Sequence, residues 1–182
     1  MELRDERAGD GPAVRDLHLA AFGGHGPVVA GLVGSLRELV AAGDGLSLVA
    51  EADGRVVGHV MATRCLLDSP RRLVDVQVLS PLAVLPGFQR RGVGAALVRR
   101  VRELAAERSA PLLFLEGDPG YYRRLGFAPA GELGFRKPSL RIPDAAFQVV
   151  RLPAHEPWMT GTLVYSEPFW RHDAVGLRDP QA

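Results

Sequence analysis

A glycine- and arginine-rich loop lies between a predicted strand and a predicted amphipathic helix. The loop is Gln89-Arg90-Arg91-Gly92-Val93-Gly94, and apolar residues then recur at helical spacing as far as Leu104. The first amide groups of a helix have no partner within it, and the helix dipole gives them partial positive charge. Because the glycines leave these amides open and two arginines stand beside them, the stretch predicts a polyphosphate-binding corner.

Two common phosphate-binding loops do not fit this stretch. A Walker loop needs Gly-x-x-x-x-Gly-Lys followed by Ser or Thr, and the sequence has no such run. A dinucleotide-binding loop needs Gly-x-Gly-x-x-Gly, but Leu97 stands where the third glycine is required. The pattern Gln-x-x-Gly-x-Gly instead resembles the acetyl-coenzyme A loop of the GCN5-related N-acetyltransferases. Taken alone, the loop could also be an ordinary strand-to-helix turn with two solvated arginines.

A second motif supports the same resemblance. Residues 116–127 include Tyr122-Arg123-Arg124-Leu125-Gly126-Phe127, which is similar to the Tyr-x-x-x-Gly-Phe segment after the fifth strand in that family. The order and separation of the two motifs also match. The resemblance is close over residues 79–127 and looser over most of the chain. It implies an α/β fold, the acyl-CoA N-acyltransferase fold, with a central mixed, mostly antiparallel sheet flanked by helices.

The resemblance also implies the residues that bind acetyl-CoA, the expected co-substrate. The phosphates would lie on the loop and the first turn of the helix, at Gln89, Arg90, Arg91, Gly92, Val93, Gly94 and Ala95. The main chain of Leu82, Ala83 and Val84 would pair with the pantetheine arm like an added strand. Tyr122 would protonate the departing sulfur, since a phenol is protonated at neutral pH. In the alternative interpretation, the Tyr122 ring only packs against its helix.

The acceptor side carries weaker signals. Two predicted helices flank the connection Gly23-Gly24-His25-Gly26-Pro27, which in the family lies over the acceptor. His25 is therefore a candidate substrate-binding residue, although a solvated loop histidine is the alternative. Candidates for a general base are Glu116, Asp118, Asp75, His59 and His25, and a chain of waters could replace any of them. No motif selects among these groups.

Hydrophobic periodicity predicts the remaining elements. We expect helices from a cap at Asp10 to Phe22, over 28–40 and over 92–108, with a short helix at Tyr122. Strands are predicted at 2–4, 46–51, 55–62, 73–79, 112–115, 147–152 and 161–165, and Asp53-Gly54 predicts a hairpin turn. In the strand at 73–79, Asp75 and Gln77 share a polar face, which either meets solvent or lines the acceptor cavity.

Composition limits the other function classes. The 182 residues carry a net charge of +1, which gives no broad electrostatic case for nucleic acid or a membrane surface. The single Cys65 excludes an internal disulfide and a cysteine metal cluster, and we expect it to be a buried hydrophobe. We expect no metal. The first seven residues lack the apolar core of a signal peptide, so a cytoplasmic protein is the expectation.

These observations predict one N-acetyltransferase domain over 1–170 and a frayed tail over 171–182. The expected reaction is direct attack of a primary amine, on a small molecule or a protein, at the thioester of acetyl-CoA. A homodimer is possible. Transfer of a longer acyl group is an alternative, and a non-catalytic acyl-CoA sensor or partner-binding module is another. The sequence does not specify the acceptor.

Overall fold

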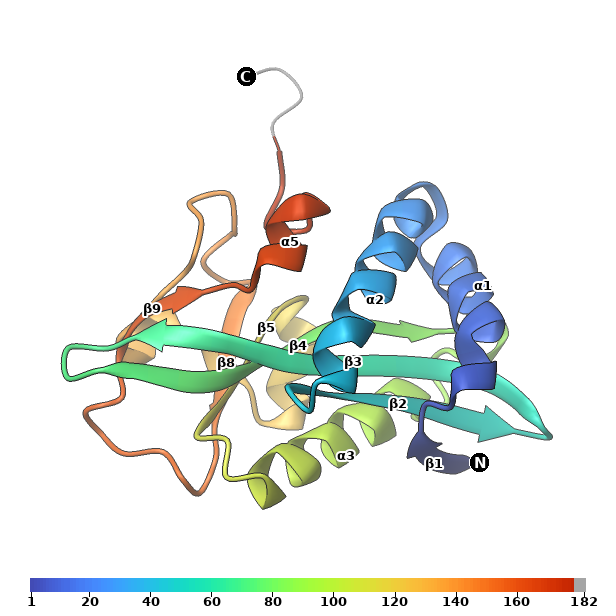
Figure 1. The fold of residues 1–182 in the computed structure, drawn as a ribbon, viewed down its shortest axis with the longest axis horizontal. Helices are drawn as coiled ribbons and strands as arrows, with labels where there is room; N and C mark the ends of the chain where they lie inside the picture. Colours follow the sequence, from blue (N-terminus) through green and yellow to red (C-terminus); the bar gives the residue numbers. More distant parts are fainter. Residues whose placement is uncertain (179–182) are drawn as a thin grey trace. The chain divides into compact units, whose positions relative to one another are not determined.

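Residues 1–178 are described by the structure, a computed structural model in which a mixed sheet is flanked by helices (Figure 1). The chain divides into two compact units. Unit 1 comprises residues 1–63 and 79–104, and unit 2 comprises residues 64–78 and the chain from residue 105 onward. The predicted α/β fold class is confirmed, whereas the single domain over 1–170 stays a prediction.

Unit 1 is built on an antiparallel ladder. β1 (Glu2–Asp5) pairs with β2 (Gly45–Ala52), and β2 pairs with the first part of β3 (Arg55–Asp68). Asp53 and Gly54 join β2 to β3 with φ of 52° and 72°, the left-handed pair that a two-residue hairpin turn of type I′ requires. The last part of β4 (Leu73–Val84) completes the unit, and Leu85 N donates to Val57 O at 2.9 Å just beyond its end.

Helices cover both faces of this ladder (Figure 1). A Cβ built on Gly58 would lie 2.9 Å from side chains of α3 (Val93–Glu107), whereas the next residue, His59, contacts His18 of α1 (Gly11–Phe22). Successive strand residues point to opposite faces, so α1 and α3 lie on opposite sides of β3. α2 (Gly26–Ala41) packs against α1.

The start of α1 differs from the prediction. Asp10 precedes the helix, but its carboxylate accepts hydrogen bonds from Arg7 N and the Arg4 guanidinium, both at 2.7 Å, and not from the helix. The physical reason is its backbone. Asp10 is the last residue of the short 3-10 helix η1 (Ala8–Asp10) and has helical φ and ψ, whereas a capping side chain normally reaches forward from an extended residue.

The connection between α1 and α2 is tighter than predicted. It is only the 3-10 turn η2 (Gly23–His25), and α2 already begins at Gly26. A Cβ on Gly26 would lie 2.8 Å from the Leu19 Cα, so glycine allows α2 to start against the backbone of α1. Within residues 1–178, the stretch Ala8–Ala41 is long and apolar enough for a membrane span, but it is divided by this turn into two packed helices.

Unit 2 is organised around β5 (Leu112–Glu116). On one edge, β5 pairs in parallel with β4, with Gln77 opposite Leu113 and Val78 opposite Phe114. On its other edge, β5 pairs antiparallel with β8 (Phe147–Arg151). β8 also pairs with β6 (Ala128–Pro129). β9 (Gly161–Val164) pairs with the end of β3 and with β7 (Phe135–Arg136). All four residues Leu112–Leu115 are fully buried, which explains their continuous apolar run.

The core of unit 2 is aromatic. The Phe114 ring stands perpendicular to Phe135 at 5.2 Å and is stacked on Phe147 at 5.7 Å. Cys65 is 2% exposed, as predicted, and its Sγ accepts a hydrogen bond from Ser166 N at the start of α5 (Glu167–Arg171). Burial raises the pKa of the Cys65 thiol to about 11, so the thiol is not activated as a nucleophile.

The structure differs from the expected frayed tail over residues 171–178. Val175 is fully buried, Gly176 N donates to the Glu116 carboxylate at 3.1 Å, and Leu177 N donates to Arg141 O at 3.1 Å. These contacts hold the segment against the rest of unit 2. Residues 179–182 of the predicted tail lie outside the described residues.

Candidate functional site

The predicted phosphate loop lies between β4 and α3 in unit 1. It follows the 3-10 turn η3 (Pro86–Phe88), and the Gln89 side chain donates from Nε2 to the Val84 carbonyl oxygen at 3.1 Å. Arg90 and Gly92 have φ of 60° and 83°, so the chain turns through the left-handed region twice before α3. Such turns re-aim successive backbone N–H groups and favour concave anion sites.

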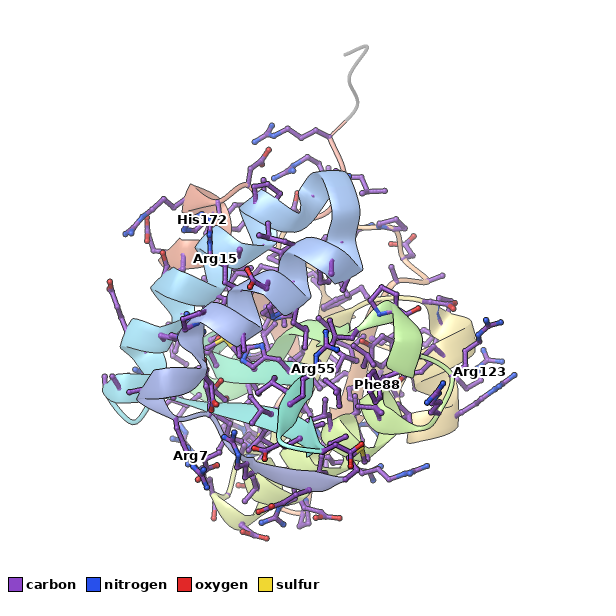
Figure 2. The ribbon with its side chains drawn as sticks, turned by 90° about the vertical axis from the view of Figure 1, so that its right-hand side faces the viewer. Arg7, Arg15, Arg55, Phe88, Arg123 and His172 are labelled. Atoms are coloured by element: carbon purple, nitrogen blue, oxygen red, sulfur yellow. The ribbon has the colours of Figure 1, made fainter. Side chains whose placement is uncertain are left out.

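The first turn of α3 presents the amides that the sequence predicted. Ala96 N donates to Gly92 O at 2.9 Å, so the N–H groups of Val93, Gly94 and Ala95 precede the first intrahelical bond. A Cβ on Gly92 would meet no atom within 4 Å, and its positive φ is therefore what favours glycine there. Arg91, which lies 5.5 Å from the Phe88 ring labelled in Figure 2, is exposed, as is Arg90. Polyphosphate binding by this loop stays a prediction.

The predicted pantetheine segment forms the end of β4. Ala83 is 4% exposed, and Leu82 and Val84 are half-buried. The hydrogen bond from Gln89 to Val84 O joins this segment to the phosphate loop within unit 1. The structure therefore brings the ten predicted cofactor residues into one contiguous part of unit 1. Their pairing with a pantetheine arm stays a prediction.

Tyr122 ends a short helix in unit 2, α4 (Pro119–Tyr122). Asp118 caps this helix by accepting a hydrogen bond from Gly120 N at 2.8 Å. A Cβ built on Gly117 would lie 2.3 Å from Cε2 of Tyr122, so the ring packs directly on the glycine backbone, with Phe127 5.7 Å away. Burial, followed by the neighbouring Tyr121 and Asp118, raises the pKa of Tyr122. No sequence motif indicated this role of Gly117.

Most of the candidate bases are engaged in other interactions. Asp118 caps α4, and Asp75 forms an exposed ion pair with Arg64 at 2.8 Å, so this part of the β4 polar face meets solvent. Glu116 accepts the Tyr165 hydroxyl at 2.8 Å and Gly176 N at 3.1 Å, and burial raises the pKa of its carboxyl. His25 is exposed at the end of η2.

His59 belongs to a buried polar chain in unit 1 that the sequence analysis did not recognise. Its Nδ1 lies 2.8 Å from Nε2 of His18, and its Nε2 lies 2.9 Å from the Ser47 hydroxyl. Ser47 donates to Glu6, which also binds the Arg37 guanidinium. The available signal was that His18 and His59 occupy positions whose spacing places them on apolar, buried faces.

Comparison with known proteins decides the family. Residues 43–129 match the acetyltransferase (GNAT) domain model. The uncharacterized N-acetyltransferase YjhQ of Escherichia coli (strain K12) is 35% identical over 163 residues, which cover 87% of this chain and 88% of that relative. The chain belongs to the GCN5-related N-acetyltransferase (GNAT) family. The predicted family is thus confirmed.

Two solved structures resemble this GNAT chain over nearly its whole length. The GNAT family N-acetyltransferase YhbS of Escherichia coli, crystallised with CoA, is 30% identical, with a TM-score of 0.81 and coverage of 93% of this chain and 92% of that one. A GNAT family acetyltransferase of Brucella melitensis, crystallised with acetyl-CoA, is 30% identical, with a TM-score of 0.72 and coverage of 92% and 97%. Both ligands agree with the co-substrate expected for this GNAT chain.

Proposed function

We propose that this protein is a cytoplasmic N-acetyltransferase that moves the acetyl group of acetyl-CoA to a primary amine. The acceptor is a small molecule or an exposed amine of a protein. The observation that carries the proposal is the loop before α3. Gln89 joins this loop to Val84, and the loop leads into the helix amides that precede the first intrahelical bond. Family relatives bound to CoA and acetyl-CoA support the same co-substrate.

In this proposal the loop binds the phosphates of acetyl-CoA. The N–H groups of Val93, Gly94 and Ala95 donate to the pyrophosphate oxygens, and the helix dipole adds to the attraction. Arg90 and Arg91 are exposed and bind further phosphate oxygens as charged donors. The main chain of Leu82, Ala83 and Val84 binds the pantetheine arm by strand-like hydrogen bonds.

The reaction is a direct exchange of bonds at the acetyl carbon. The amine nitrogen forms a bond to the carbonyl carbon, the carbon–sulfur bond breaks, and CoA departs as a thiolate. The nitrogen loses one proton and the sulfur finally gains one, so the proton count balances. Orientation of the two reactants supplies much of the rate.

Tyr122 is the proposed donor to the sulfur. Its raised pKa keeps the phenol protonated at neutral pH, so that the hydroxyl can donate a hydrogen bond to the developing thiolate. The same shift makes complete proton transfer less favourable than for a free phenol. We therefore assign Tyr122 mainly to stabilisation of the charge that appears on sulfur. His25, exposed on η2, remains a proposed contact of the acceptor.

A screen for thiol release tests the proposal. Acetyl-CoA is incubated with the protein and a library of primary amines, and free CoA is measured over time. We expect amine-dependent release. The matched pair Ala95→Asp and Ala95→Asn tests the loop, because the side chains have the same shape but only Asp repels phosphate.

An acidic residue in the first turn does not weaken a helix, so loss of CoA affinity in Ala95→Asp cannot be attributed to unfolding of α3. We expect the calorimetric affinity for CoA to be at least about tenfold weaker in the Asp variant than in the Asn variant. Equal affinities would contradict the phosphate site. CoA binding without turnover of any amine would favour the acyl-CoA sensor over an enzyme.

A further inference from the structure

The buried hydrogen bonds of unit 1 that link Glu6, Ser47, His59 and His18 all donate in the same direction. Glu6 is ionised, because hydrogen bonds from His59, Arg37 and Ser47 outweigh its burial and lower its pKa to about 2. A carboxylate only accepts, so the Ser47 hydroxyl proton points to Glu6. The Ser47 oxygen can then only accept from His59, and the proton of neutral His59 must be on Nε2.

The same reasoning fixes His18. With its proton on Nε2, the Nδ1 of His59 is an acceptor, and the 2.8 Å contact requires the Nε2–H of His18 as donor. A neutral His18 therefore carries a bare Nδ1. That atom is fully buried and has no hydrogen-bond partner within the described residues. A buried acceptor without a donor is costly, so a ligand with an N–H would be favoured there.

Burial is the main reason that His18 stays neutral. Glu6 follows β1, Arg37 comes from α2, Asp10 precedes α1, and His59 lies on β3. Burial above all, then repulsion from Arg37 and from His59 whenever both rings are protonated, lowers the pKa of His18 to about 3. Burial also lowers the pKa of His59, although Glu6 opposes this. His18 thus stays a hydrogen-bond acceptor, rather than a cation, throughout the neutral pH range.

A metal ion does not explain the cluster. His18 Nε2 and His59 Nδ1 are already used in a hydrogen bond with each other, so neither atom can bind a metal at the same time. Residues 1–178 also contain no group of three or more His, Cys, Asp or Glu side chains suited to a metal. The neighbouring Arg37 guanidinium also repels a cation. The cluster therefore accounts for Nε2 of His18 but not for its Nδ1.

His59 places the hydrogen-bonded cluster beside the segment of β4 that is proposed to bind the cofactor in the same unit. Leu85 N donates to Val57 O, so these two residues face each other across β3 and β4. Because the strands are antiparallel, moving two residues forward on β3 moves two residues back on β4. We therefore expect His59 to lie opposite Ala83, in the segment proposed to bind the pantetheine arm. His59 faces α1 and not α3, so His18 lies on the α1 side of that segment.

An aromatic side chain at the end of α1 contacts His18. The Phe22 ring is stacked on the His18 ring at 5.8 Å, with 14° between their planes, and Phe22 is itself 36% exposed. Phe22 immediately precedes Gly23, whose φ of 53° ends the helix. Phe22 is therefore the partly exposed neighbour of His18 whose movement an entering ligand would require.

We propose that Nδ1 of His18 accepts a hydrogen bond from the amine nitrogen of the acceptor, and that Glu6, Ser47 and His59 hold the ring in the tautomer that allows it. The proposal rests on the proposed acetyl transfer and specifies its acceptor side. His18 contacts substrate, whereas the other three are positioning residues. The favoured acceptor is a primary amine on an apolar stem, because His18 is buried and the Phe22 ring stacks on it.

Nitrogen-15 NMR of histidine-labelled protein tests the tautomers without any turnover. We expect His18 and His59 each to show a protonated Nε2 and a bare Nδ1 at neutral pH. Addition of the amine with the fastest turnover in the screen should shift the His18 Nδ1 signal toward that of a hydrogen-bonded acceptor. A protonated Nδ1 on His18, or no shift at saturating amine, would overturn the proposal.

Kinetics of three variants give an independent test. His18→Leu should raise the acceptor KM about fivefold to tenfold, the factor expected for one ordinary hydrogen bond. His18→Asn keeps an acceptor oxygen near the Nδ1 position and should recover part of that loss. Arg15→Gln, on the exposed face of α1 (Figure 2), is the control and should match the parent. The KM for acetyl-CoA should stay within about twofold in all three.

The outcomes separate the two proposals. Parent turnover together with a parent-like acceptor KM in His18→Leu would overturn the role of His18 alone. An equal rise of both KM values would assign His18 to structure only, and would also overturn it. A parent protein that transfers acetyl groups to no amine would overturn the proposed function, and this inference with it.

Discussion

Gln89 and Val84 are joined by a hydrogen bond of 3.1 Å from the side-chain Nε2 to the main-chain oxygen. The bond closes a loop that contains the 3-10 turn Pro86–Phe88 and directs the chain toward α3. Because Arg90 follows at once with a positive φ, the bond helps to hold a turn that is unfavourable for a residue with a Cβ. The glutamine of the motif therefore acts first on the loop conformation.

We predict that Gln89→Ala weakens CoA binding about threefold to tenfold, because the loop must be ordered by the ligand instead of by the side chain. Gln89 is exposed, so the thermal midpoint of unfolding should change little. Isothermal calorimetry with CoA measures the effect. Arg99→Gln, on the exposed surface of α3, is the control. Unchanged affinity in Gln89→Ala would show that the loop holds its shape without this bond.

We predict that Tyr122→Phe lowers kcat by about 10²-fold to 10³-fold, the range typical of losing one hydrogen-bond donor to a developing charge, while CoA affinity stays near that of the parent. The hydroxyl is needed mainly when charge develops on sulfur. Steady-state turnover and calorimetry separate the two effects. Tyr121→Phe, at the more exposed neighbour, should leave kcat unchanged. A Tyr122→Phe variant within about twofold of the parent would assign the ring to packing alone.

We predict that Gly117→Ala impairs turnover through Tyr122. The new methyl group would lie 2.3 Å from Cε2 of the Tyr122 ring, so the ring must move. Overpacking of this kind costs about 1–3 kcal/mol of stability. Gly131→Ala adds the same methyl group where no atom lies within 4 Å and serves as the matched control. If Gly117→Ala lowered kcat in the parent but caused no further loss in a Tyr122→Phe background, the effect would act through Tyr122. Parent-like kcat in Gly117→Ala would contradict the role of the ring.

We predict that the free energy of unfolding falls as the pH drops from about 6.5 toward 3. In this range the unfolded chain binds a proton at His18, whereas burial keeps the folded pKa at about 3. The unfolded state thus binds more protons, and stability rises with pH by up to about 1.4 kcal/mol per pH unit for this group. Glu6 adds to this loss below about pH 4.5, because the unfolded chain then binds a proton at Glu6, whereas the folded pKa is about 2.

Urea unfolding at several pH values tests this slope. His18→Leu should make the slope shallower by about one proton, while Arg15→Gln should leave it unchanged because arginine does not titrate in this range. An identical slope in His18→Leu and the parent would show that His18 is not held neutral by the fold.

The fold was predictable where a local signal existed. Asp53-Gly54 predicted the β2–β3 turn, and the apolar run Leu112–Leu115 predicted a strand covered on both faces; the structure confirms both. The two-residue strands β6 and β7 were missed, because two residues are too few to show a period. β3 extends to Asp68, beyond the predicted end at Ala62, because its pairing with β9 depends on residues about a hundred positions away.

The candidate site was predictable only where its residues are contiguous in sequence. The phosphate loop and Tyr122 each lie in one short motif, so resemblance to the family's motifs could propose them. The chain from Glu6 through Ser47 and His59 to His18 draws on four separate segments, and no local pattern reports such a contact. The need for glycine at position 117 likewise becomes apparent only when the Tyr122 ring is seen to pack on it.

The bond from Gly176 N to Glu116 has a practical consequence for handling the protein. Glu116 is the last residue of β5, and its other carboxylate oxygen accepts the Tyr165 hydroxyl. Removal of the chain after Ala174 would therefore take away the donor from Gly176 N. A cleavable affinity tag therefore belongs beyond Arg178, with its protease site outside this anchor. A preparation trimmed back into residues 174–178 would be expected to precipitate or lose activity on storage, even though every motif residue is still present.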